Sequence, residues 1–308
     1  MASRPEKLLL LDTASLYFRA FYGVPDKVKA DDGTSVNAAR GLLDIIAKLV
    51  TTYEPTRLVA CWDDDWRPGW RVDLLPTYKA HRVVETVEGG PDVEEVPAAL
   101  TAQIPLIRET LETLGLAIVG APEHEADDVI GTLTTRADVP VDIVTGDRDL
   151  FQLVDDGRGI RVVYTARGMN NLEIIDDAAV QARYGIRAAQ YADFAALRGD
   201  PSDGLPGVPG IGEKSAAALL AAAGDLDGIR SAAAEGTAGS PAQRAKILAA
   251  ADYLDVAPTV VGVVRDLDLA PVDDRIAVDD ARAEAATALA ARWNLGTSMT
   301  RALAALRG

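Results

Sequence analysis

The sequence contains few of the residues that form disulfides, imidazole metal sites or membrane spans. It has one cysteine, Cys61, which excludes an internal disulfide and fits a reducing, cytoplasmic environment. Its two histidines, His81 and His124, lie far apart, which argues against a histidine-centred metal site. No apolar run reaches the roughly 18 residues of a membrane span. The N-terminal stretch MASRPEKLLLLD lacks the small-residue cleavage site of a signal peptide.

Positive charge is also scarce. The chain has 31 basic against 47 acidic residues, a formal net charge of −16, which argues weakly against nonspecific binding to nucleic acid. However, metal-ligating carboxylates would add to the negative count, and local patches matter more than the total. The 308 residues, 48% of them hydrophobic, suffice for one large domain or two modest ones.

Short apolar runs without alternation predict strands that are buried on both faces. They cover residues 7–11, 57–62, 116–119, 141–145 and 160–164. Helical patterns separate them at 37–52, 96–114 and 126–136. This alternation predicts an α/β fold, a mostly parallel central sheet with flanking helices, whose ligands bind at the carboxyl ends of the strands.

Nine carboxylates fall in five short clusters, most of them where a strand should end or a loop should begin. Burying acids that converge costs several kcal/mol each unless they are paired, and no equal cluster of bases accompanies these. Oxygen ligands suit Mg²⁺ or Mn²⁺, so the pattern predicts a two-metal phosphodiesterase. The nine are Asp12, Asp63, Glu125, Asp127, Asp128, Asp147, Asp149, Asp200 and Asp203.

Each cluster also has a purely structural interpretation. Asp12 would serve as a helix N-cap, and the acids at 125–128 would favour the first turn of a helix through its dipole. The pair at 147 and 149 would simply shape a turn, although its spacing also lets both carboxylates reach one ion.

Two segments carry basic and aromatic residues together. Residues 67–97 have no clean period, and there Arg71 and Tyr78 accompany Lys79 and Arg82. Their alternation suggests contact with a single strand, or else a solvated loop, and Lys79 and Arg82 are expected to share one helical face. Near the N-terminus three residues would offer a cation and stacking faces to DNA bases, or be ordinary surface and core residues: Arg19, Phe21 and Tyr22.

The most specific stretch is GDPSDGLPGVPGIGEKSA, residues 199–216. It matches a helix–hairpin–helix pattern, in which glycines let backbone amides approach a phosphate and the next helix adds a favourable dipole. The residues expected to bind DNA here are Gly207, Gly210, Gly212 and Lys214. Carbonyls of such a hairpin can also hold a monovalent cation.

The chain resembles the bacterial flap endonuclease and 5′-3′ exonuclease family, and is similar to the 5′-nuclease domain of DNA polymerase I. The resemblance runs from about residue 8 to 224, through LLLLDTASLYFRAFYG, LVACWDD, PTYKAHR, HEADDVIGTL, TGDRDLFQLV and GDPSDGLPGVPGIGEKSA. It implies a PIN-like nuclease core at residues 1–178 with a helical arch at about 66–97. It also implies a helix-three-turn-helix DNA-binding and C-terminal helical region at 179–308, with no polymerase domain.

The resemblance assigns roles to the acids and bases. A first ion would use Asp12, Asp63, Glu125 and Asp127, a second Asp147, Asp149, Asp200 and Asp203, and Asp128 would be an outer-shell or third-ion ligand. Lys79 and Arg82 would grip the scissile phosphate, and K⁺ is a candidate at the hairpin. The expected substrates are DNA with 5′ flaps, nicks, gaps or free 5′ ends, cut by a monomer in replication and repair.

Three departures from the family pattern stand out. Thr13 replaces a usual Gly and is expected to crowd DNA, and Gly204 replaces a usual Asn and is expected to loosen the loop at Asp203. Three acids stand at 63–65 where one is usual, and Asp63 is the expected ligand because it follows the strand most closely. Two other functions remain open: a non-catalytic DNA-structure-binding protein and a PIN-like ribonuclease.

Overall fold

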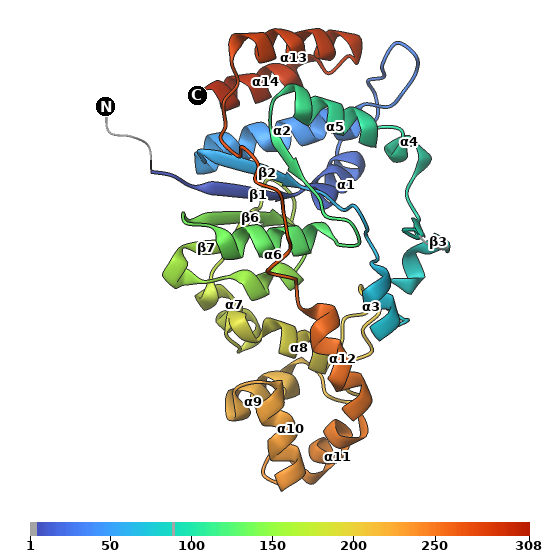
Figure 1. Cartoon of the computed structure of the whole chain (residues 1–308), viewed down its shortest axis with the longest axis vertical. Helices are drawn as coiled ribbons and strands as arrows, with labels where there is room; N and C mark the ends of the chain where they lie inside the picture. Colours follow the sequence, from blue (N-terminus) through green and yellow to red (C-terminus); the bar gives the residue numbers. More distant parts are fainter. Residues whose placement is uncertain (1–4, 88–89) are drawn as a thin grey trace.

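A six-stranded sheet forms the centre of the computed structural model, which describes residues 5–87 and 90–308 (Figure 1). The strand order is β5-β2-β1-β6-β7-β8, and all neighbouring pairs are parallel except β7 and β8. The five expected strands are confirmed, and the antiparallel strand β8 was not expected. The strands are β1 (Leu8–Asp12), β2 (Arg57–Cys61), β5 (Ala117–Val119), β6 (Val141–Thr145), β7 (Ile160–Tyr164) and β8 (Glu173–Ile175).

The inner strands are largely apolar because helices cover both faces of the sheet. In β1, Leu8 and Leu10 enter one hydrophobic core while Leu9 and Leu11 enter the other, and all four are at most 4% exposed. Asp142 within β6 is an exception, since it is 2% exposed and pairs with Lys7 and Arg161.

One face of the sheet carries helices from both ends of the chain (Figure 1). They are α1 (Thr13–Gly23), α2 (Asn37–Tyr53), α5 (Ile104–Thr113), α13 (Asp280–Arg292) and α14 (Gly296–Arg307). The helix expected over 96–114 is divided into α4 (Ala98–Thr101) and α5. The other face carries α6 (Ala126–Arg136) and two short 3₁₀ turns, η2 (Asp149–Leu153) and η3 (Asp156–Arg158).

A helical lobe lies below the sheet in Figure 1. It contains α7 (Asp177–Tyr184), η4 (Ala188–Gln190), α8 (Tyr191–Arg198), α9 (Glu213–Ala223), α10 (Leu226–Glu235), α11 (Pro241–Ala249) and α12 (Ala251–Val261). The chain then returns to the sheet, where the N–H of Leu58 donates to the carbonyl of Asp274 at 2.7 Å. The division after residue 178 stays a prediction, and α13 and α14 pack beside the sheet rather than in the lobe.

The segment expected to form a helical arch is helical only in part. It contains α3 (Gly69–Leu74), the 3₁₀ turn η1 (Ala80–Arg82) and a hairpin of β3 (Val83–Glu85) with β4 (Val93–Glu94). Lys79 has a φ of 47°, in the left-handed region, and precedes η1. The expectation that Lys79 and Arg82 share a helical face is therefore wrong.

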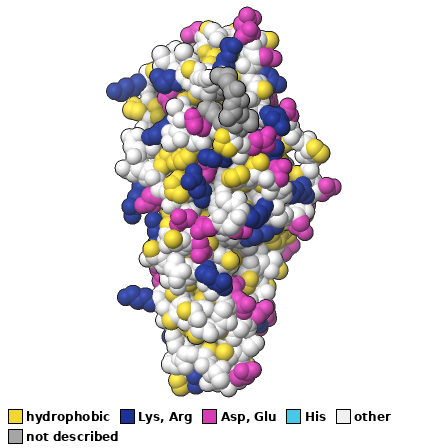
Figure 2. Space-filling model, turned by 90° about the vertical axis from the view of Figure 1, so that its left-hand side faces the viewer, with side chains coloured by type: hydrophobic (Ala, Val, Ile, Leu, Met, Phe, Trp, Pro, Cys, Tyr) yellow, Lys and Arg dark blue, Asp and Glu magenta, His cyan; other side chains and the backbone are white. Residues whose placement is uncertain are grey.

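The side of the molecule in Figure 2 shows Lys and Arg interspersed with Asp and Glu, without a broad area of one sign. This side offers no extended positive surface that would attract a nucleic-acid backbone. Across the described residues 5–87 and 90–308, no helix combines the length and the apolarity needed to cross a membrane.

Candidate active site

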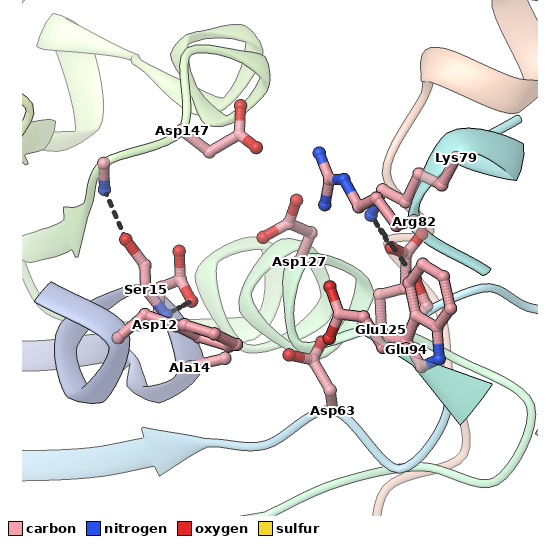
Figure 3. Close-up of a pocket in the computed structure, with 13 residues that line it drawn as sticks. Asp12, Ala14, Ser15, Asp63, Lys79, Arg82, Glu94, Glu125, Asp127 and Asp147 are labelled. Carbon is pink, nitrogen blue, oxygen red and sulfur yellow. Dashed lines mark hydrogen bonds and ion pairs between the residues drawn. The ribbon is translucent and has the colours of Figure 1, made fainter. Parts of the chain in front are cut away.

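Five of the nine predicted carboxylates line one cavity at the carboxyl edge of the sheet (Figure 3). They come from the end of β1, the segments after β2 and β6, and the start of α6, so elements far apart in sequence converge here. The cavity measures about 390 Å³. The five are Asp12, Asp63, Glu125, Asp127 and Asp147.

Asp12 serves both as a helix cap and as part of the cavity. Its Oδ1 accepts the N–H of Ser15 at 3.1 Å, which caps α1, and its Oδ2 accepts the hydroxyl of Thr145 at 2.6 Å. The β1–β6 register sets Leu11 beside Val144, which brings the ends of the two strands together. Asp12 is therefore both a helix N-cap and a carboxylate of the cavity, so its two interpretations are compatible.

The start of α6 fixes the next carboxylates. Asp63 Oδ1 accepts the N–H of Ala126 at 2.7 Å, so this carboxylate also stabilises the helix N-terminus. Glu125 and Asp128 form a capping box around the first turn. Glu125 and Asp127 then face the cavity (Figure 3).

Burial and repulsion between charges raise the pKa values of three carboxylates of the cavity, those of Asp12, Asp63 and Asp127. Burial raises the pKa of Asp63 to about 7, with a further contribution from Asp12, and that of Asp12 to about 6, opposed by its hydrogen bonds and reinforced by Asp147. Burial and the charges of Asp147 and Asp12 raise the pKa of Asp127 well above its usual value. A cation in this cavity would be strongly stabilised.

Two side chains bring positive charge to the cavity, Lys79 and Arg82. Lys79 forms an ion pair with Glu125 Oε1, and Arg82 lies 3.2 Å from Asp203 Oδ1. Burial opposes the charge of Lys79, but the charges of Glu125 and its neighbours together outweigh that effect, and the pKa of Lys79 lies well above its usual value. The Lys79 side chain therefore brings a cation to the cavity.

Asp128 lies outside the cavity lining, and its expected role as an outer-shell or third-ion ligand stays a prediction. Its two oxygens accept both terminal nitrogens of Arg71, at 2.7 and 2.9 Å, as well as the N–H of Val264 and of Glu125. It is fully buried, with 0% exposure.

Arg71 and Tyr78, expected to contact DNA, are buried as well. Arg71 is 2% exposed and pairs with Glu125 and Asp128, while the Tyr78 hydroxyl donates to Glu125 Oε2 at 2.7 Å. Arg71 also donates to the carbonyl of Val260 at 3.1 Å. These two residues hold the segment before Lys79 against α6, and the prediction that they bind DNA is wrong for this conformation.

Of the second predicted group of acids only Asp147 lines the cavity, and Asp149, Asp200 and Asp203 lie outside its lining. Burial raises the pKa of Asp203 to about 6 and that of Asp149 well above its usual value, and Asp147 contributes to both shifts. Asp200 instead accepts from Arg148 at 3.0 Å and Arg198 at 3.1 Å, so it braces its loop instead of facing the cavity, against expectation.

The predicted hairpin joins α8 to α9 and its glycines have different environments. Gly207 is buried, and a side chain there would lie 2.5 Å from the backbone nitrogen of Gly199, so the predicted phosphate contact is wrong. Gly210 and Gly212 are exposed, as is Lys214 in the first turn of α9. The carbonyl of Gly210 accepts Lys246 Nζ at 3.2 Å. DNA binding by the exposed three stays a prediction.

Both single-residue departures behave differently from expectation. Thr13 is 1% exposed and its hydroxyl donates to the carbonyl of Leu11, so it does not narrow the cavity. Gly204 has a φ of 71°, and a Cβ there would lie 2.0 Å from the carbonyl oxygen of Thr77. Gly204 therefore allows its loop to touch the arch segment closely instead of loosening it.

The three predicted DNA-contacting residues of α1 lie beside the cavity rather than inside it. Tyr22 is 72% exposed, and Phe21 packs edge-on against it with ring centroids 5.2 Å apart. Arg19 is partly buried, and its Nε lacks a hydrogen-bond partner. Their exposure is compatible with DNA contact, which stays a prediction.

Sequence reasoning missed several residues that shape the cavity. Glu94 lines it from the arch segment, where no periodic pattern marked this residue. Ser15 also lines it, and its Oγ accepts the N–H of Gly146 at 3.0 Å, which fixes the turn before Asp147. The only signal in the sequence was the position of Ser15 one helical turn after Asp12.

The donor set fits hard divalent cations. The cavity offers carboxylate oxygens, which suit Mg²⁺ or Mn²⁺, and burial together with neighbouring negative charges raises the pKa values of Asp63 and Asp127. Within the two described stretches of the chain, no three His, Cys, Asp or Glu side chains lie close enough to enclose an ion as they stand. The acids surround the cavity, so bridging water or side-chain movement would complete the coordination.

The raised pKa values predict an unusual pH dependence of stability without metal. Asp12 and Asp63 bind protons more tightly in the folded than in the unfolded protein. Their contribution to the free energy of unfolding is therefore complete below about pH 4 and is lost as the pH rises through 6 to 7. In EDTA, we expect the melting temperature of Asp63→Asn to exceed that of the wild type at pH 8 and to fall less between pH 5 and 8. Asp31→Asn, an exposed control, should follow the wild type. Equal slopes for Asp63→Asn and the wild type would contradict this origin.

The mostly parallel sheet thus carries an acidic cavity at its carboxyl edge, and a helical lobe with a glycine-rich turn between α8 and α9 accompanies it. Residues 7–185 match the 5′-3′ exonuclease N-terminal resolvase-like domain, and residues 186–284 match the 5′-3′ exonuclease C-terminal SAM fold. The chain belongs to the 5′-3′ exonuclease family.

Two known proteins are similar to this chain over nearly their whole length. A 5′-3′ exonuclease of Streptomyces coelicolor is 58% identical over 97% of this chain and 99% of its own length. A 5′-3′ exonuclease of Mycobacterium tuberculosis is 49% identical over 97% of both chains. A solved flap endonuclease of bacteriophage T5, in a pseudo-enzyme–product complex with DNA and metal ions, has a TM-score of 0.62 at 16% identity, covering 98% of this chain and 100% of that one. This last similarity shows the fold.

Proposed function

We propose that this 5′-3′ exonuclease is also a structure-specific flap endonuclease that needs a divalent metal and cuts DNA at 5′ flaps, nicks, gaps and free 5′ ends in replication and repair. The observation that carries the proposal is the group of buried and partly buried carboxylates beside Lys79 and Arg82 at one sheet edge. The T5 relative, crystallised with both DNA and metal ions, supports it.

The carboxylates that would hold two Mg²⁺ or Mn²⁺ ions fall into two groups. Asp12, Asp63, Glu125 and Asp127 would serve one ion, directly or through water, and Asp147, Asp149 and Asp203 the other. When bound, such ions polarise the phosphate and lower the pKa of coordinated water. The chain itself supplies Lys79 and Arg82, which offset charge on the scissile phosphate and orient it above the acids.

The helical lobe would bind the DNA duplex at a distance from the catalytic cavity. The N-terminus of α9 is open, because a side chain added at Gly212 would meet nothing within 4 Å, so a phosphate can approach its free N–H groups. Lys214 lies in the same turn and adds charge. K⁺ at the hairpin carbonyls remains part of this proposal, as do monomeric action, a cytoplasmic location and the domain division after residue 178.

The test is cleavage of a labelled 5′-flap DNA with Mg²⁺, Mn²⁺ or EDTA, with the product ends mapped. We expect cutting near the flap junction with either metal, a 5′-phosphate on the product, and no cutting in EDTA. Binding without cutting under any metal would instead identify a DNA-structure-binding protein. Cleavage of the matching RNA alone would identify a ribonuclease, and both outcomes would overturn the proposal.

A further inference from the structure

A second, larger cavity adjoins the catalytic one. It measures about 830 Å³ and lies between α1, α2 and the turn that joins β7 to β8. Ser15 and Phe18 line both cavities, so the two share a wall. A DNA strand that leaves the catalytic cavity on this side would meet the second one.

The charge of this second cavity is positive, in contrast to the protein as a whole. Arg19 and Lys48 line it, and neither forms an ion pair with a carboxylate of the described residues. The buried Nε of Arg19 has no hydrogen-bond partner, and Lys48 donates only to neutral oxygens, the carbonyl of Met169 at 2.5 Å and Asn170 Oδ1 at 3.2 Å.

Asp44 also lines this cavity, but its carboxylate is already paired with residues of α14. Asp44 Oδ1 accepts two nitrogens of Arg301 in α14, at 2.9 and 2.7 Å, and its Oδ2 accepts the hydroxyl of Ser298 at 3.1 Å. The positive charges of the cavity are therefore available to an anion from outside.

The remaining walls suit a flat apolar ring. Tyr22, 72% exposed, stands at the cavity, and its position is supported by the edge-on ring of Phe21. Phe18, which is stacked on Tyr17 at 5.3 Å, forms the wall shared with the catalytic cavity. An aromatic face beside two cations matches a nucleotide, which combines a base with a phosphate.

We propose that this cavity seats one unpaired nucleotide of the DNA substrate, with its base against Tyr22 and its phosphate near Arg19 and Lys48. This inference rests on the proposed action on DNA and adds a positioning site to it. A free mononucleotide shares the same chemistry, and the experiment separates the two sources.

The experiment measures the affinity of wild type, Tyr22→Ala and Lys48→Gln for flap DNA in Ca²⁺ without turnover, with each nucleotide near the junction replaced in turn by an abasic residue. We expect one abasic position to weaken wild-type binding by about 5- to 150-fold, the range of base–aromatic stacking. Tyr22→Ala should bind intact DNA more weakly than the wild type by the same factor. Its affinity should not change further when that position is abasic. Lys48→Gln should reduce the salt slope of binding by about one.

Arg275→Gln provides the matched control, because Arg275 is exposed and lies beside the opposite end of β2. It should bind all these DNAs as the wild type does. If Tyr22→Ala and Lys48→Gln also bind as the wild type while flap cleavage persists, the nucleotide site is overturned and the proposed function stands. If the wild type neither binds nor cuts DNA, the proposed function is overturned, and the nucleotide site, which rests on it, is overturned as well. Competition by free mononucleotide, without an abasic-sensitive position, would overturn the assignment to the substrate strand.

Discussion

Asp147→Asn should abolish cleavage of flap DNA while leaving DNA binding intact. Asp147 lies in the turn after β6, where its N–H donates to Thr145 Oγ1 at 2.8 Å and its Oδ1 accepts the N–H of Asp149 at 2.9 Å. Asparagine keeps the size and the acceptor oxygen, so the turn should survive, but the charge needed to hold a cation is lost. We expect a decrease in the cleavage rate of at least about 10³-fold, or about 4 kcal/mol in activation free energy.

The measurement is single-turnover cleavage in Mg²⁺ together with DNA affinity in Ca²⁺. The control is Asp155→Asn, because Asp155 caps the turn η3 away from the catalytic cavity. It should cut at the wild-type rate. Cleavage by Asp147→Asn at the wild-type rate would show that the catalytic site is misplaced, and loss of binding as well would show that the substitution disturbs the fold.

Arg71→Met should destabilise the protein by about 3–5 kcal/mol, the cost of leaving the buried carboxylate of Asp128 without a charged partner. The Arg71 side chain is 2% exposed and is shared by Glu125 and Asp128, which are 5% and 0% exposed. It also reaches the backbone of Val260 and Gly262 at the end of α12, so three segments meet at this guanidinium. Methionine fills similar space but leaves the two carboxylates facing each other.

Urea unfolding followed by circular dichroism in EDTA would measure this loss. The double variant Arg71→Met/Asp128→Leu should recover part of it, since apolar groups can replace a buried ion pair at little cost. Arg275→Gln, which removes an exposed arginine, should change the unfolding free energy by less than about 0.5 kcal/mol. A wild-type unfolding midpoint for Arg71→Met would contradict the structural role of this arginine.

The strand ends and their acids could be predicted from sequence because both depend on local patterns. Continuous apolar runs marked the buried strands. Asp12 follows such a run directly, and Asp147 lies in the turn after another. Local patterns could not predict which of several neighbouring acids would face the cavity. Consecutive helical residues point about 100° apart, so Asp127 and Asp128 cannot both face the cavity. Which one does depends on Arg71, 57 residues away from Asp128 in the chain.

The break between α4 and α5 shows the same limit. The apolar pattern over 96–114 predicted one helix, but the chain turns at Gln103, whose Oε1 accepts the N–H of Ala38 at 2.8 Å. This bond caps α2, which has no side-chain cap of its own. A capping partner 65 residues distant leaves no trace in a local pattern, and neither does the buried position of Gly207 against Gly199.

The return of the chain to the sheet has a consequence for the order of folding. The outer face of α2 is covered by α14, and Ser298 meets Asp44 across 254 residues of sequence. Contacts of such large sequence separation form slowly because a long loop must close first. On the ribosome, α14 emerges after every other helix and strand of this domain. The core that carries Asp12 therefore stays incompletely packed until synthesis has passed the final helix.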